Sequence, residues 1–73
     1  MRLEVQNAIN LLDDVGVWAI SPSMIHDYLV NQKGFEVSKD EVMICIDELS
    51  ASDFIVWDAT KAYVRPVLYV NNP

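Results

Sequence analysis

Apolar residues recur with helical spacing near the start of the chain. Between residues 3 and 15 they fall on one stripe with the period of an α-helix, and Gly16 follows as a typical C-terminal stop. The stripe consists of Val5, Ala8, Ile9, Leu12 and Val15. The next residues, 17–20, form a short apolar and partly β-branched run, Val-Trp-Ala-Ile. This run predicts a short strand at the edge of a small sheet.

Two further helices are predicted from their start signals. Ser21-Pro22 is typical of a helix start, because serine caps the first turn and proline fits the first helical position. This helix should run to about residue 33 and end at Gly34. The third helix begins after Ser38, where residues 38–41 match the S-x-x-E capping box. The expected buried stripes are Ile25, Tyr28 and Leu29, then Val42, Cys45, Ile46 and Leu49 bordered by Met43, with Val37 and Val42 spaced as a hydrophobic staple.

A β-hairpin is predicted after the third helix. Residues 50–53 indicate a turn, in which Asp53 tolerates a left-handed backbone better than most residues. The β-rich segments 54–57 and 62–64 are separated by residues 58–61, so we expect a four-residue loop. Pro66 should bound the second strand. Residues 67–70 predict a further apolar strand, and pairing with a second copy of the chain would cover it if it were exposed.

The predicted order of elements resembles the winged helix-turn-helix family over roughly residues 3–66. The resemblance is carried by Ser21-Pro22, by V-S-x-x-E-V at residues 37–42, by L-S-A-S-D-F-I at residues 49–55 and by Y-V-R-P at residues 63–66. It implies an α+β fold of three helices with a small antiparallel sheet whose C-terminal hairpin is the wing. One domain would span residues 1–73, with the strand at 67–70 as an addition.

Composition and charge narrow the classes of function. A chain of 73 residues, 52% of them hydrophobic, has room for one folded domain. A single cysteine and the absence of a signal-peptide pattern predict a cytoplasmic protein, and no apolar run approaches the roughly 18 residues of a membrane span. With 11 acidic and 5 basic residues, the net charge of −6 opposes binding to anionic membranes and to nucleic acid.

Catalytic and metal chemistry find little support in the sequence. His26 has Asp27 beside it but no second histidine or cysteine at ligand spacing, whereas a structural zinc site needs about four such ligands. Cys45 falls on a buried stripe, which is more typical of a core residue than of a nucleophile. Gly16 and Gly34 are too far apart to form a phosphate-binding loop. We therefore expect no enzyme, cofactor, metal or small-molecule substrate.

The third helix departs from the pattern that DNA reading requires. The resemblance implies that a DNA reader would place this helix in the major groove and the wing on the backbone, using Lys33, Lys39, Lys61 and Arg65. Instead the helix carries four acids and no arginine for a bidentate guanine contact. Asp40 and Asp47 lie about 10.5 Å apart along the axis, a spacing that allows phosphate mimicry. Asp40 and Glu41 in the first turn also complement the helix dipole. This simpler role favours the alternative interpretation, in which the acidic face is only solvated and binds no partner.

Aromatic residues of the hairpin offer a second candidate surface. Strand alternation places Phe54 and Val56 on one face and Ile55 and Trp57 on the other. Trp57 and Tyr63 either pair across the hairpin or contact a partner, because tryptophan and tyrosine are enriched at interface hot spots.

The leading hypothesis is a small non-enzymatic binding module that acts through protein–protein contacts. The predicted setting is regulation of transcription or of a nucleic-acid machine, and size and charge suit a phage- or plasmid-type modulator that occupies a DNA-binding surface. The predicted contact residues are Asp40, Met43, Asp47, Glu48, Trp57, Tyr63 and Tyr69. The alternative is a dimeric DNA-binding transcriptional regulator that uses the third helix and the wing. A self-assembling subunit, dimerising through residues 67–70, is a third hypothesis.

Overall fold

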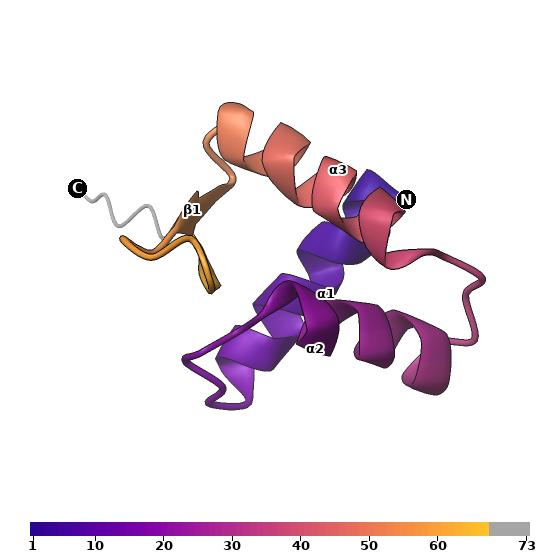
Figure 1. The fold of residues 1–73 in the computed structure, drawn as a ribbon. Coiled ribbons are helices and arrows are strands. Elements are labelled where there is room, and N and C mark those ends of the chain that lie inside the picture. Colours follow the sequence, from indigo (N-terminus) through magenta and orange to yellow (C-terminus); the bar gives the residue numbers. More distant parts are fainter. Residues whose placement is uncertain (68–73) are drawn as a thin grey trace.

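Three helical segments and one β-hairpin make up residues 1–67, the part of the chain that the computed structural model describes (Figure 1). Helix α1 comes first, α2 continues directly into the π-helical segment η1, and α3 leads into the two strands. The bounds are α1 Arg2–Asp14, α2 Pro22–Asp27, η1 Tyr28–Gln32, α3 Lys39–Ala51, β1 Ile55–Trp57 and β2 Val64–Pro66. The predicted α+β class and the three predicted helices are therefore confirmed.

A single apolar core forms where α1 meets the other elements. Helix α1 contacts α2, η1, α3 and β2, and α3 also contacts α2 and β1. The hairpin lies at the C-terminal end of α3, away from the connection between η1 and α3 (Figure 1). The buried residues are Val5, Ala8, Ile9, Ile20, Ile25, Leu29, Val37, Val42, Cys45, Ile46, Leu49, Ile55 and Val64. Within residues 1–67 no polar or charged residue is buried, so apolar burial stabilises the fold.

No helix within residues 1–67 combines the length and the apolar character that crossing a membrane requires.

The predicted helix starts are confirmed by their hydrogen bonds. The Ser21 hydroxyl accepts from the Met24 N–H at 3.2 Å, and Pro22 is the first residue of α2. The Ser38 hydroxyl accepts from the Glu41 N–H at 3.1 Å, which is the forward half of the predicted capping box. The reverse bond, from the Ser38 N–H to the Glu41 side chain, is not formed in the described part of the chain.

A left-handed residue follows the C-terminal end of α1, of η1 and of α3. These residues are Gly16 at φ 96°, Gly34 at φ 73° and Asp53 at φ 63°. The next N–H then donates back to a carbonyl of the helix, as in a Schellman motif. The three bonds are Val17 to Leu12 at 2.9 Å, Phe35 to Leu29 at 3.0 Å and Phe54 to Leu49 at 3.0 Å. Asp53 thus takes a place that glycine fills elsewhere, as predicted.

The predicted burial of Val15 is wrong. Its side chain is 67% exposed, because α1 ends at Asp14 and Val15 already belongs to the turn toward Gly16. The remaining residues of the predicted stripes are buried or packed against the core.

The hairpin has a longer loop than predicted. Its strands pair Ile55 with Pro66 and Trp57 with Val64, so residues 58–63 connect them in place of the predicted four residues. The carboxylate of Asp58 causes the difference, because its Oδ1 accepts from the N–H groups of Ala62 and Tyr63 at 2.9 and 3.1 Å. The left-handed Lys61, at φ 57°, completes the loop. The cross-strand pairing of Trp57 with Tyr63 is consequently wrong.

Removing the Asp58 carboxylate should loosen this loop. Hydrogen bonds from the Thr60 hydroxyl and from the Tyr63 and Ala62 backbone lower the pKa of the Asp58 carboxyl below its usual value. A lowered pKa stabilises the folded hairpin above the unfolded-state pKa of about 3.9, and this contribution disappears as pH falls through the lower folded-state value. We expect faster amide exchange at residues 62 and 63 in Asp58→Ala, measured by NMR, with the wild type approaching the variant in acid. Equal exchange in both proteins at neutral pH would contradict the role of Asp58.

The strand predicted at residues 17–20 is reduced to one bridge. Ile20 pairs with Val64, whose N–H donates to the Ile20 carbonyl at 2.9 Å. Extending this antiparallel ladder would require residue 66 to donate to the Trp18 carbonyl. Pro66 has no N–H, so the ladder stops and Trp18 stays 82% exposed. Pro66 itself is the last residue of β2.

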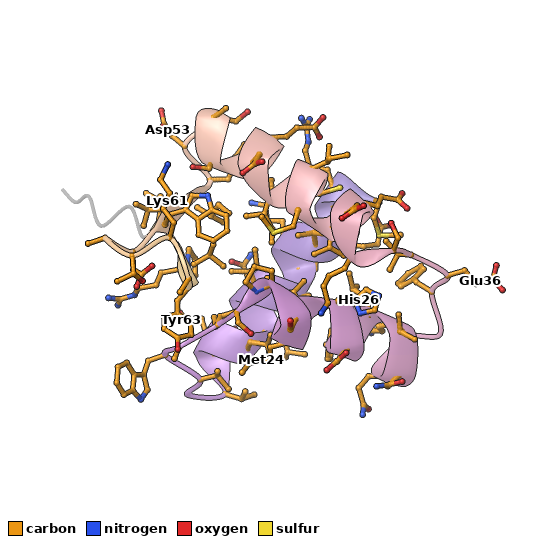
Figure 2. All side chains as sticks on the ribbon, in the orientation of Figure 1. Met24, His26, Glu36, Asp53, Lys61 and Tyr63 are labelled. Carbon is orange, nitrogen blue, oxygen red and sulfur yellow. The ribbon has the colours of Figure 1, made fainter. Side chains whose placement is uncertain are left out.

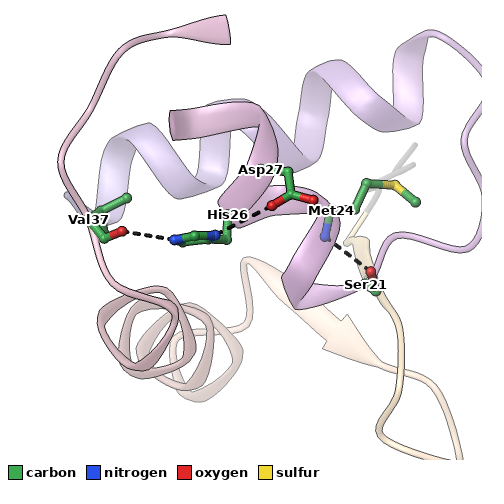
Figure 3. A network of polar contacts seen from close by, with 5 residues as sticks. All are labelled: Ser21, Met24, His26, Asp27 and Val37. Carbon is green, nitrogen blue, oxygen red and sulfur yellow. Dashed lines mark hydrogen bonds and ion pairs between the residues drawn. The ribbon is translucent and has the colours of Figure 1, made fainter. Parts of the chain in front are cut away.

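His26 connects α2 to the start of α3. Its Nε2 lies 2.9 Å from the Val37 carbonyl, one residue before the Ser38 cap (Figure 3). In this geometry Nε2 carries the proton and donates. The other ring nitrogen, Nδ1, is buried and lies 3.6 Å from an Asp27 oxygen, and it forms no hydrogen bond within residues 1–67. The predicted neighbour Asp27 is therefore close to His26 without bonding to it.

Loss of the His26 side chain should destabilise the fold. In His26→Ala the part-buried Val37 carbonyl loses its donor, which costs about 1 to 2 kcal/mol. The variant His26→Gln can still offer an amide N–H and should recover part of this loss. Urea unfolding followed by circular dichroism measures both. A wild-type midpoint in His26→Ala would show that the hydrogen bond contributes nothing to stability.

Candidate functional site

An isoleucine on the solvent side of α3 stands out among the exposed residues. The buried side of this helix carries Val42, Cys45, Ile46 and Leu49. Ile44 points away from them and is 59% exposed, whereas Ile46, two residues on, has no exposed surface. One exposed apolar side chain is common on a protein surface, so its meaning depends on its neighbours.

Four carboxylates surround Ile44. They occupy positions i−4, i−3, i+3 and i+4 of the helix, the positions that place side chains next to one another. Each lies within about 60° of Ile44 around the axis and about 4.5 to 6 Å from it along the axis. These four are Asp40, Glu41, Asp47 and Glu48, and all are exposed. We call the five residues together the Ile44 face.

The charges of the Ile44 face have no internal partner. Within residues 1–67 no Lys or Arg side chain comes within ion-pair distance of any of these four carboxylates. The close contacts of acidic groups in this part of the chain are those of Glu4 with the N-terminal amino group, at 3.4 Å, and of Asp27 with the His26 ring, at 3.6 Å. Asp40 and Glu41 lie in the first turn of α3, where the helix dipole favours them. Glu48 lies in the last turn and Asp47 just before it, where the same dipole disfavours negative charge. The stability of the helix therefore does not explain why acidic residues occupy positions 47 and 48.

The residues predicted for protein contact do not form one surface. Asp40, Asp47 and Glu48 belong to the Ile44 face, but Met43 is only partly exposed and packs against the core. Trp57 also packs against the core, because it lies on the inward side of β1 together with Ile55. The remaining two are Tyr63, exposed in the hairpin loop, and Tyr69, which lies outside the described residues.

The basic residues predicted for DNA contact are exposed but divided between two ends of the molecule. Lys61 lies in the hairpin loop (Figure 2) and Arg65 on β2. Lys39 begins α3, and Lys33 follows η1, where it lines a groove of about 380 Å³ against α1. Helix α3 separates the two groups by about 18 Å, at 1.5 Å per residue. The Ile44 face occupies about 12 Å of that length, so phosphates bridging both groups along α3 would meet its carboxylates.

Burial raises the pKa of the Cys45 thiol, which favours its neutral form over the nucleophilic thiolate. Among residues 1–67 no three histidine, cysteine or acidic side chains come together as metal ligands would.

Ile44 was missed by the sequence reasoning, although a signal was present. At 100° per residue, position 44 falls about 150° from the centre of the buried stripe of α3. An isoleucine so far from the core stripe is predicted to be exposed.

Comparisons with protein-family models, with curated proteins and with solved structures found no match to this chain. The geometry of residues 1–67 therefore carries the functional conclusion.

Proposed function

We propose that the chain is a winged-helix module that binds a protein partner through the Ile44 face and does not read DNA with α3. Three helices followed by a hairpin, with an additional bridge from Ile20 to β2, support the winged-helix assignment. In this assignment α3 is the helix that a DNA reader would place in the major groove, and the hairpin is the wing.

The observation that carries this function is Ile44 within its four carboxylates. An apolar side chain at the centre of a charged ring has the layout of an interface, with a desolvated anchor and a polar rim. The ring is negative throughout, so the complementary surface is cationic with an apolar pocket at its centre. Lysine- and arginine-rich surfaces of this kind bind nucleic acid phosphates. The proposed setting is therefore regulation of transcription or of a nucleic-acid machine by occupation of such a surface.

Capture of the protein partner from an extract should require the Ile44 side chain. With the protein immobilised and an extract of its source cells applied, Ile44→Ser should lose the retained partner. Loss of a central anchor typically costs about 2 kcal/mol or more, roughly thirtyfold in affinity. Val15→Ser is the matched control, since Val15 is 67% exposed and lies at the far end of α1. Retention of the same partner by both variants, at equal strength, would contradict the proposal.

Titration with duplex DNA separates this function from the alternative regulator. Fluorescence anisotropy with random-sequence duplex at about 50 mM salt favours electrostatic binding, and even sequence-specific readers bind under such conditions. We expect no saturation at tens of micromolar protein. Binding that weakens steeply with added salt, and that is lost on charge reversal of Lys39 and Lys61, would instead establish DNA recognition.

A further inference from the structure

Strand β1 is the outer strand of the small sheet. Val64 of β2 pairs with Trp57 on one side and with Ile20 on the other, so β2 lies between β1 and the Ile20 bridge. Residues 1–67 place no strand on the other side of β1. An outer strand presents backbone donors and acceptors along its free edge.

The hydrogen-bond pattern identifies which backbone groups face that edge. The Asp58 N–H donates to the Tyr63 carbonyl at 2.9 Å, and the Val67 N–H donates to the Phe54 carbonyl at 3.1 Å. In an antiparallel pair, hydrogen-bonded and non-hydrogen-bonded pairs alternate. Residues 55–57 lie between these two bonds and follow the same alternation. The backbone of Val56 is therefore hydrogen-bonded to β2, whereas the backbone groups of Ile55 and Trp57 are not. The N–H and C=O groups of Ile55 and Trp57 point to the free edge, and none forms a hydrogen bond within residues 1–67.

The side chains of β1 suit strand addition. Residues 54–57 read Phe-Ile-Val-Trp, an uncharged run of residues with high β-propensity. Ile55 and Trp57 pack inward, which fixes the strand, whereas Phe54 and Val56 are 48% and 50% exposed on the outer face of the sheet. An added strand would gain backbone hydrogen bonds at the edge and apolar contacts beside Phe54 and Val56.

We infer that the free edge of β1 binds an extended protein segment with apolar residues at its centre and lysine or arginine at its ends. Asp53 and Asp58 flank the run, and both are charged residues at the ends of an otherwise neutral strand. A segment with cationic ends places opposite charges beside them. A second copy of this chain fits less well, because antiparallel pairing of two β1 strands gathers an Asp53 and an Asp58 at each end and joins two chains of charge −6.

Amide hydrogen exchange tests the edge directly. In the free protein, the amides of Ile55 and Trp57 should exchange much faster than those of Val56 and Val64, which are hydrogen-bonded within the sheet. The probe is the peptide acetyl-Lys-Val-Thr-Val-Thr-Val-Lys-amide. At about nine times its dissociation constant, exchange at Ile55 and Trp57 should slow about tenfold, while Val56 and Ile44 stay unchanged.

Four controls make the result decisive. A peptide whose central valine is replaced by proline should give no protection, and one with glutamate at both ends should bind at least tenfold more weakly. The variant Asp53→Asn keeps the side-chain shape and should reduce the difference between the lysine and glutamate peptides, while Asp58 still holds the hairpin loop. Ile44→Ser should bind the lysine peptide with the affinity of the wild type. The proposal for the β1 edge and the proposal for the Ile44 face can therefore be contradicted independently.

Three outcomes would overturn the inference. The first is slow exchange of Ile55 and Trp57 in the free protein at every concentration, which would mean that the edge is already covered. The second is protection that rises with protein concentration alone, which would make a second copy the occupant. The third is unchanged exchange at Ile55 and Trp57 with millimolar lysine peptide.

Discussion

Ile46→Ala should unfold much of the protein, whereas Ile44→Ala should leave its stability almost unchanged. Both residues are isoleucines of α3, two positions apart, but Ile46 is fully buried and Ile44 is 59% exposed. Truncating a buried isoleucine costs about 2 to 5 kcal/mol, because transfer energy is lost and a cavity remains. A single core in a chain of this size supplies only about 3 to 5 kcal/mol in total. The exposed position should change stability by less than about 0.5 kcal/mol.

Urea unfolding followed by far-ultraviolet circular dichroism measures both variants on the same scale. Wild-type helix content in Ile44→Ala together with a partly unfolded Ile46→Ala would support the placement of the two side chains. An equally damaged Ile44→Ala would mean that Ile44 is covered in solution, for example by a second copy. Repeating the unfolding at several protein concentrations shows whether a second copy covers Ile44, because an unfolding midpoint that rises with concentration indicates association.

The helices were predictable because their signals are local. Ser21-Pro22 and Ser38 each act on backbone groups within the next three residues, and Gly34 acts on the turn it occupies. Such contacts need no information from distant parts of the chain. The same locality explains the correct prediction that Asp53 is left-handed.

The strands were less predictable because their limits depend on distant partners. The hairpin loop is six residues long since the Asp58 side chain binds two N–H groups four and five residues away, which propensity alone does not reveal. The strand expected at residues 17–20 fails because of Pro66, which is remote in sequence and becomes its neighbour only through the Ile20–Val64 bridge. Pairing register is therefore the information that the sequence reasoning lacked.

The acidic residues of the Ile44 face were predicted from the sequence, whereas Ile44 at its centre was not. Asp40, Asp47 and Glu48 were identified from their positions on the predicted third helix, where the winged-helix resemblance implies basic residues in a DNA reader. Strand alternation leaves open which face of β1 packs on the helices, and in the structure Trp57 packs against the core on the inward face, away from the Ile44 face. The free groups of Ile55 and Trp57 follow only from the observed register.

Reversing two charges of the Ile44 face should stabilise the fold and abolish partner binding. In the double variant Asp47→Lys and Glu48→Lys, negative charges at the C-terminal end of α3 become positive. Interaction with the helix dipole then improves by about 0.3 to 1 kcal/mol in total at low salt. The same change places two cations against a cationic partner, and like charges at an interface cost several kcal/mol. A loss of at least about 100-fold in affinity is expected.

Asp13→Lys and Asp14→Lys provide a matched control for this double variant. These residues are adjacent acids at the C-terminal end of α1, so the change in net charge is the same and the gain with the helix dipole is at least as large. They lie outside the Ile44 face, and partner capture should survive the change. Titration calorimetry against the captured partner, with thermal unfolding of both double variants, separates the two effects. Equal loss of binding in both would attribute it to net charge, whereas loss confined to α3 with raised stability would show that Asp47 and Glu48 are retained for binding at a cost to the helix.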